Sequence, residues 1–237
     1  MKYIASVSFG KDSLAMLLML IEKKYPLDEV VFYDTGMEFK AIYNLKSKIE
    51  LLLKEHNIKF TELKPEYDFL YKMFKKPVKE RKTGNIHYGY SWCGGTCRWG
   101  TSDKLRYIEK YCKGNYEYVG IAADETMRIE KERKGNKLFP LVEWKITEQQ
   151  ALDFCYAKGY DWNEDDIDLY KILKRVSCWC CGNKNLKELK NYYKFLPDYW
   201  DKLKKLQLQT SRNMKGKYSV LDLEKKFDKE LEVQVNE

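Results

Sequence analysis

The first half of the chain alternates short apolar runs with longer amphipathic segments. Apolar runs of strand length, rich in β-branched and aromatic residues, occupy residues 2–8, 29–35, 58–63 and 117–123. Segments with helical periodicity occupy residues 13–24, 38–55 and 102–111. Strands and helices that alternate at this spacing favour a parallel sheet with helices on both faces. The pattern therefore predicts an α/β fold built on an open, mostly parallel sheet.

From about Thr147 onward the pattern becomes mostly helical. Thr147 and Gln150 have the spacing of a capping box, in which each side chain bonds the backbone N–H of the other residue. No internal repeat and no low-complexity linker interrupts the chain. We therefore expect an α/β domain over residues 1–146 and a helical C-terminal extension over residues 147–237.

Composition narrows the class of protein. Of the 237 residues, 44% are hydrophobic, enough for a substantial core, but no apolar run is long enough to span a bilayer. The N-terminus does not resemble a signal peptide, so we expect a cytoplasmic protein without a membrane partner. Seven cysteines in such a chain indicate metal binding, catalysis or burial rather than a disulfide framework.

The net charge of +8 is concentrated in two basic blocks. Residues 72–82 carry six Lys or Arg against one acidic residue, and residues 184–217 carry ten against three. These blocks suit a nucleic acid partner, and they equally suit a solvated helix surface. Aromatic side chains that interleave the second block are of the kind that stack on bases, but their helical spacing is also typical of a core. They are Tyr192, Tyr193, Phe195, Tyr199 and Trp200.

The segment V-S-F-G-K-D-S at residues 7–13 has the features of a phosphate-binding turn. It joins the first predicted strand to the first predicted helix, and ligands of open parallel sheets bind beyond such strand ends. Gly10 permits close approach of the backbone, and the new helix offers unpaired N–H groups. Lys11 adds a cation, and Ser8 and Ser13 add hydroxyls. We therefore expect a phosphate cradle here.

This cradle differs from a Walker A loop, because Ala5 occupies the earlier glycine position and Asp12 follows Lys11. Instead, S-F-G-K-D-S resembles the PP-loop of the N-type ATP pyrophosphatases, in the form of the phosphoadenosine phosphosulfate (PAPS) reductase branch. The resemblance implies an adenine nucleotide alpha hydrolase-like fold that binds ATP or a related adenine nucleotide with Mg²⁺. It identifies six loop residues as nucleotide-binding: Ser8, Phe9, Gly10, Lys11, Asp12 and Ser13.

Three further segments resemble the same branch, and together the resemblance covers roughly residues 1–195. D-T-G-M-E-F at 34–39 resembles its D-T-G-x-x-F/Y, and G-I-A-A-D-E-T-M-R at 120–128 resembles its G-x-R-x-x-E-x-x-x-R. F-P-L-V-E-W at 139–144 resembles its P-L-x-x-W. The resemblance implies catalytic roles for Lys11, Asp12 and Arg128. It adds five nucleotide-binding residues: Asp34, Thr35, Gly36, Gly120 and Glu125.

Two departures from the PAPS reductases bear on the reaction. Ala122 stands where the branch has its first arginine, and no E-C-G-x-H segment follows Cys181, the last cysteine. We therefore do not expect thioredoxin-dependent reduction of PAPS. The resemblance implies instead a sulfur-transfer enzyme that acts on ATP at the α-phosphate, releasing pyrophosphate, or on a sulfonucleotide. The alternative is a nucleic-acid-directed module, for thiolation or defence, in which the PP-loop only senses nucleotide.

Five of the seven cysteines fall in two clusters flanked by glycine. Cys93 and Cys97 lie in W-C-G-G-T-C-R-W, and S-C-W-C-C-G-N contributes three more. Two pairs of thiolates brought together by the fold suit zinc or an iron–sulfur cluster. Cys112 and Cys155 lie on apolar helix faces, where we expect them to be core residues.

The C-W-x-C pattern of the second cluster resembles the cysteine motif of DNA phosphorothioation sulfurtransferases of the same branch. That resemblance implies a 4Fe–4S iron–sulfur cluster, with zinc as the alternative. The expected metal ligands are Cys93, Cys97, Cys178 and Cys181. Cys180 would then be a spare thiolate, available to ligate or to react.

Overall fold

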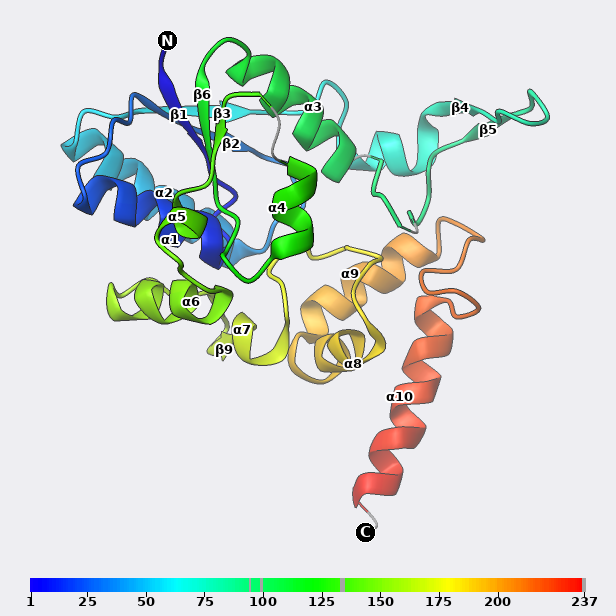
Figure 1. Cartoon of the computed structure of the whole chain (residues 1–237). Coiled ribbons are helices and arrows are strands. Elements are labelled where there is room, and N and C mark those ends of the chain that lie inside the picture. The colour runs from blue at the N-terminus through cyan, green and yellow to red at the C-terminus, as the bar shows by residue number, and fades with distance from the viewer. Residues whose placement is uncertain (94, 99, 133–134, 236–237) are drawn as a thin grey trace. The chain divides into compact units, whose positions relative to one another are not determined.

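The chain folds into two units, each assembled from segments that are distant in sequence (Figure 1). The computed structural model describes residues 1–93, 95–98, 100–132 and 135–235. One unit, here called the α/β unit, comprises Met1–Asp34, Glu38–Lys64 and Lys104–Leu169. The other, here called the cysteine unit, comprises Thr35–Met37, Pro65–Asp103 and Tyr170–Glu237. This division differs from the single boundary expected after residue 146, because residues 65–103 group with the helical tail.

Five parallel strands form the sheet of the α/β unit. They are β1 (Tyr3–Ser6), β2 (Glu29–Tyr33), β3 (Lys59–Leu63), β6 (Tyr116–Val119) and β7 (Lys137–Leu138). Their order is β3-β2-β1-β6-β7, and Ala5 lies between Val30 and Tyr118 in register. The predicted α/β fold with a parallel sheet is confirmed. β7, only two residues long, carries no periodic signal in the sequence.

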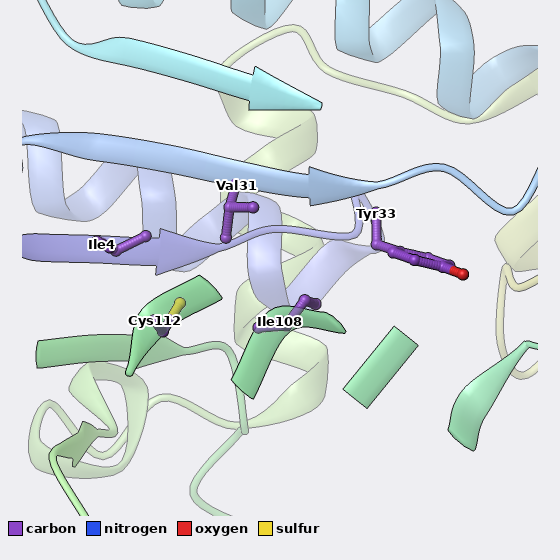
Figure 2. Packing of buried hydrophobic residues seen from close by; sticks show 5 residues of the cluster. All are labelled: Ile4, Val31, Tyr33, Ile108 and Cys112. Atoms are coloured by element: carbon purple, nitrogen blue, oxygen red, sulfur yellow. The ribbon is translucent and has the colours of Figure 1, made fainter. Parts of the chain in front are cut away.

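Side chains that alternate along the strands bury both faces of this sheet. Ile4, Val31 and Tyr33 pack against Ile108 and Cys112 of α3, as Figure 2 shows. Phe32, which points the other way, packs against Phe9 with ring centroids 5.0 Å apart. The helices of this unit are α1 (Lys11–Glu22), α2 (Lys40–Glu55), α3 (Thr101–Cys112, begun in the cysteine unit), α4 (Thr126–Glu132), α5 (Pro140–Glu143) and α6 (Glu148–Ala157).

The helix expected from Thr147 is α6, and its capping box is confirmed. The Thr147 side chain accepts a hydrogen bond from the Gln150 N–H, and the Gln150 side chain accepts one from the Thr147 N–H. The helix packs against α1 within the α/β unit. Beyond it lie the short hairpin of β8 (Asn163–Glu164) and β9 (Ile167–Asp168), then α7 (Leu169–Ile172), which leads into the cysteine unit.

The cysteine unit combines a basic hairpin with three longer helices. The π-helix η1 (Tyr71–Lys75) precedes an antiparallel hairpin of β4 (Pro77–Lys79) and β5 (Ile86–Tyr88), which Figure 1 shows as an extended arm. The helices are α8 (Leu186–Phe195), α9 (Pro197–Gln207) and α10 (Val220–Val235). Tyr192, Tyr199 and Trp200 are buried. These aromatic residues of the second basic block therefore serve the core rather than a base-stacking surface.

In the described part of the chain, no helix has both the length and the apolar character that crossing a membrane requires.

Candidate nucleotide loop and cysteine site

The S-F-G-K-D-S segment lies where the connections of the sheet change direction. From β1 the chain adds β2 and β3 on one side, and β6 and β7 on the other. The carboxyl ends of β1 and β6 therefore border the switch point at which open α/β sheets bind their ligands. Gly10 is the N-cap of α1 and brings no side chain to its first turn. The N–H groups of that turn can thus face an anion.

Phe9 holds the turn in an unusual backbone conformation. Its φ is 56°, in the left-handed region that costs a residue with a side chain roughly 1–2 kcal/mol. The Phe9 ring is fully buried against Phe32 and Phe60, and the Trp162 Nε1–H donates to the Phe9 carbonyl over 2.7 Å. Packing and this hydrogen bond maintain the strained turn. Trp162 has no sequence signal that connects it to the loop.

Hydrogen bonds join the two predicted serines around Gly10. The Ser8 N–H donates to Ser13 Oγ over 3.1 Å, and the two hydroxyls lie 3.1 Å apart. Ser13 Oγ also donates to the Gly10 carbonyl over 3.1 Å. Gly120, directly after β6, approaches the same place: a Cβ there would lie 2.5 Å from Ser13 Cα. The structure therefore brings Ser8, Gly10, Ser13 and Gly120 together.

Lys11 is buried between two carboxylates. Its Nζ donates to Asp12 Oδ1 over 2.7 Å and to Glu148 Oε1 over 2.9 Å. Burial raises the pKa of Asp12, while Lys11 opposes the increase and the charges of Glu148 and Glu125 add to it. Glu148, the first residue of α6, was not predicted as a site residue. The capping box locates the start of that helix, but only the fold shows that it lies beside Lys11.

Glu125 and Arg128 form an ion pair at the end of β6. Arg128 Nη1 donates to Glu125 Oε2 over 3.1 Å, and the Arg128 side chain is half exposed. The charge of Glu125 also contributes to the raised pKa of Asp12, after burial and the charge of Glu148. Ala122, in the place of the branch's first arginine, is fully buried. Arg128 is thus a half-exposed cation held by Glu125 in the segment that follows β6.

The D-T-G segment is divided between the two units. Asp34, which follows β2, accepts a hydrogen bond of 2.8 Å from the Tyr43 hydroxyl, and burial together with this bond raises the pKa of Tyr43. Thr35 belongs to the cysteine unit, where its Oγ1 lies 3.4 Å from Cys178 Sγ. Gly36 has a φ of 73°, a conformation that favours glycine.

Three of the predicted ligand cysteines lie near one another in the cysteine unit. The thiols of Cys93 and Cys97 share a hydrogen bond, which together with burial raises the pKa of Cys93. A Cβ on Gly100 would lie 3.1 Å from Cys97 Sγ and 4.0 Å from Cys178 Sγ. The Gly100 N–H donates to Cys97 Sγ over 3.1 Å. Cys97 thus contacts Cys93 and shares with Cys178 the neighbourhood of Gly100.

Several contacts fix the loop of Cys178–Cys181 against the first cysteine loop. Asn183 Nδ2 donates to the Gly95 carbonyl over 2.7 Å, and a Cβ on Gly182 would lie 3.2 Å from the Cys93 carbonyl. Burial lowers the pKa of Lys184, an effect opposed first by the charge of Glu188 and then by Cys181 and Cys178. The Lys184 N–H donates to the Cys181 carbonyl over 3.3 Å, so this buried lysine lies beside the second cysteine cluster.

The thiols are not arranged as a preformed metal site. Over the described residues, no group of three or more Cys, His, Asp or Glu side chains has a metal-binding arrangement. All seven cysteines are free, and Cys180 is fully buried whereas Cys181 is half-buried. Cys112 and Cys155 are buried within the α/β unit, where burial raises the pKa of each thiol to about 12. The four-cysteine centre stays a prediction.

Comparison with known families assigns the chain to a family. The family model of the phosphoadenosine phosphosulfate reductase domain matches residues 2–164, which is more than half of the chain. The chain belongs to this family. The match covers the PP-loop, the D-T-G segment and the segment after β6.

Two archaeal relatives share most of this chain's length. Uncharacterized protein MJ0066 of Methanocaldococcus jannaschii is 27% identical over 221 residues, which cover 84% of this chain and 40% of the relative. Uncharacterized protein MJ0973 of the same organism is 28% identical over 225 residues, which cover 89% of this chain and 50% of the relative. The chain thus spans half or less of the length of these relatives.

Proposed function

We propose that this chain is a PP-loop enzyme that binds ATP with Mg²⁺ and cleaves it at the α-phosphate during sulfur transfer. The observation that carries the proposal is the meeting of the 8–13 loop with Gly120 at the switch point of the sheet. Membership in the PAPS reductase domain family supports an adenine nucleotide as the ligand. Ala122 in the place of the branch's first arginine argues against PAPS as substrate.

The first step would transfer the adenylyl group. An oxygen of the acceptor attacks the α-phosphorus, and the bond from that phosphorus to the oxygen of the leaving pyrophosphate breaks. Negative charge builds up on the pyrophosphate, where fixed hydrogen-bond donors and cations stabilise it. The N–H groups of the first turn of α1 and the hydroxyls of Ser8 and Ser13 are donors of this kind.

Charged side chains around the loop would orient the nucleotide. Lys11 would neutralise the leaving group, and its two carboxylate partners hold its Nζ at the start of α1. Asp12 would hold Mg²⁺, because a cation offsets the cost that burial imposes on its ionised carboxylate. Arg128, at 47% side-chain exposure, is accessible to a phosphate from solvent.

The second step would displace AMP. Adenylation converts a poor leaving oxygen of the acceptor into AMP, so a sulfur nucleophile can attack the adjoining carbon and form the carbon–sulfur bond. AMP then leaves with the electron pair of the broken carbon–oxygen bond. The sulfur donor would be held by the cysteine unit.

The cysteine loops have donors that fit a metal centre. Four thiols on two glycine-containing loops match the ligand types of an iron–sulfur cluster and of structural zinc, and we propose a 4Fe–4S cluster held by Cys93, Cys97, Cys178 and Cys181. Such a centre would bind, relay or orient sulfur. Anaerobic purification followed by visible absorption and elemental analysis tests this assignment. Iron together with a broad visible absorption band supports the cluster. Zinc without iron would assign the four cysteines to a zinc site instead, and the absence of both metals would refute the metal centre.

Nucleotide binding tests the rest of the proposal. Lys11→Ala removes a charge-assisted phosphate contact worth roughly 1.5–3 kcal/mol, so ATP affinity should fall by about tenfold or more. Calorimetric titration of both proteins with ATP and Mg²⁺ measures the change. Equal affinity for the two proteins would remove the basis for placing nucleotide in this loop.

A further inference from the structure

A cavity of about 520 Å³ opens on the basic hairpin of the cysteine unit. Four cationic side chains line it: Lys79, Arg81, Arg98 and Arg212. The ring of His87 and the thiol-bearing Cys93 also line it, and none of the described residues that line it is acidic. All these residues belong to the cysteine unit, whereas the 8–13 loop belongs to the α/β unit.

The charges of this cavity are not neutralised by neighbouring acids. Among the described residues, no carboxylate lies within salt-bridge distance of Lys79, Arg81, Arg98 or Arg212. Glu80, between two of these residues in sequence, instead accepts a hydrogen bond of 2.6 Å from the Thr83 hydroxyl. A concave wall with charge of one sign concentrates anions within it. The cavity therefore favours an anionic ligand.

Backbone hydrogen bonds join the segment after β5 to the π-helix η1 and to the residue that follows it. The Gly89 N–H donates to the Lys76 carbonyl over 2.7 Å, and the Ser91 N–H donates to the Met73 carbonyl over 2.9 Å. A Cβ on Gly89 would lie 2.1 Å from the Met73 carbonyl oxygen, so only glycine permits this contact. The arm that carries Lys79 and Arg81 is thus anchored.

A buried polar network positions the opposite wall. Gln207, at 5% exposure, accepts a hydrogen bond of 3.1 Å from Trp92 Nε1 and donates one of 3.1 Å to the Arg212 carbonyl. Ser91 Oγ lies 2.6 Å from Thr210 Oγ1. These bonds join the segment before Cys93 to the loop that carries Arg212. The backbone positions of the cavity wall are therefore set before any ligand arrives.

We propose that this cavity is a second anion site, which binds a phosphate group of a ligand next to Cys93. Three of its four cations are arginines, whose planar guanidinium groups bind phosphate oxygens in pairs. The phosphate belongs either to a nucleic acid strand or to a small phosphate ester. Its role as the site of the sulfur acceptor rests on the function proposed above, but binding of phosphate does not.

Paired charge variants test the site. Arg81→Gln/Arg212→Gln removes two charges from the cavity, and Lys187→Gln/Lys205→Gln removes two exposed charges of the second basic block outside it. Each pair is combined with Lys11→Ala, so that phosphate bound at the nucleotide loop does not obscure the result. The probes are inorganic phosphate, followed by ³¹P line broadening, and fluorescent single-stranded DNA and RNA oligonucleotides, followed by anisotropy.

We expect the arginine pair to weaken binding of at least one probe by about tenfold or more, and the lysine pair to change it far less. Tighter binding of an oligonucleotide than of phosphate identifies a nucleic acid strand, and the opposite identifies a small phosphate ester. Equal losses for both pairs, or no binding of any probe, overturn the proposal. Arg81→Gln alone, on the exposed hairpin, gives the same comparison if the double variant does not fold.

Because Lys11→Ala is present throughout, failure here is distinct from failure of the nucleotide loop. A chain that binds ATP through Lys11 but binds no probe in the cavity keeps the proposed function and loses only the second site.

Discussion

Gly120 approaches the start of α1 so closely that no side chain fits between them. In Gly120→Ala the new Cβ would lie 2.5 Å from Ser13 Cα and 2.8 Å from Ser13 N. Ordinary contacts between carbon atoms are about 3.5–4.0 Å, so the end of β6 and the first turn of α1 must separate by roughly 1 Å. Both neighbours are backbone atoms, which cannot rotate away. The strain therefore falls on the nucleotide loop.

The cost of this substitution has two parts. Overpacking of a close contact lowers the free energy of unfolding by about 1–3 kcal/mol. A displacement of about 1 Å in a group that positions substrate reduces turnover by on the order of a hundredfold. We therefore expect a protein that still folds, with a lower melting temperature and with ATP turnover that is nearly lost.

Gly159→Ala is the matched control. Gly159 has a φ of 77°, and no described heavy atom lies within 4 Å of the Cβ that alanine would add. Its cost is the left-handed backbone alone, roughly 1–2 kcal/mol. Thermal melts should show a lower melting temperature for both variants. Titrations with ATP and turnover assays should show that only Gly120→Ala loses ATP affinity and turnover. Wild-type affinity and turnover in a folded Gly120→Ala variant would refute the role of this contact.

Three further predictions address charge, metal and substrate. Burial raises the pKa of Asp12, so the folded protein binds a proton at this carboxyl group more tightly than the unfolded chain does. The folded state therefore loses stability as the pH rises through the raised pKa. Asp12→Asn should thus melt at a higher temperature than wild type at pH 7 and at the same temperature in acid, and a lower melting temperature at pH 7 would contradict this. Replacing any one of the four proposed ligand cysteines by serine should lower metal content and melting temperature together. The Cys112→Ser variant should keep the metal content of the wild type. Full metal content in all four ligand variants would count against a shared centre. Incubation with PAPS and reduced thioredoxin should release no sulfite, because Ala122 replaces the branch's first arginine. Steady sulfite production would show that this replacement does not prevent reduction of PAPS.

The sheet and the strand-to-helix turn of residues 8–13 were predictable because their signals are local. The predicted strands at 2–8, 29–35 and 117–123 are short apolar runs, and the loop of residues 8–13 lies within one strand-to-helix turn. Glycine, lysine and serine in that turn indicate phosphate binding without knowledge of distant residues. The capping box at Thr147 is local in the same way.

Features that depend on distant contacts or on exposed strands were not predictable. Glu148 and Trp162 reach the loop only through the packing of α6 and the segment after it. The hairpin strand β5 exposes Ile86 and Tyr88 at 61% and 70%, so it has no buried face to produce an alternating pattern. The cavity of the cysteine unit likewise requires Arg212 to meet a hairpin more than a hundred residues earlier in the sequence.

The products of ATP cleavage test the central proposal most directly. ATP labelled at the α-phosphate is incubated with the purified chain and Mg²⁺, where water takes the place of the acceptor oxygen that attacks the α-phosphorus. The labelled products are separated by ion-exchange chromatography. We expect label in AMP, with pyrophosphate released in equal amount, and we expect both to disappear in Lys11→Ala. Label in ADP with release of orthophosphate, or equal product from wild type and Lys11→Ala, would contradict cleavage at the α-phosphate in this loop.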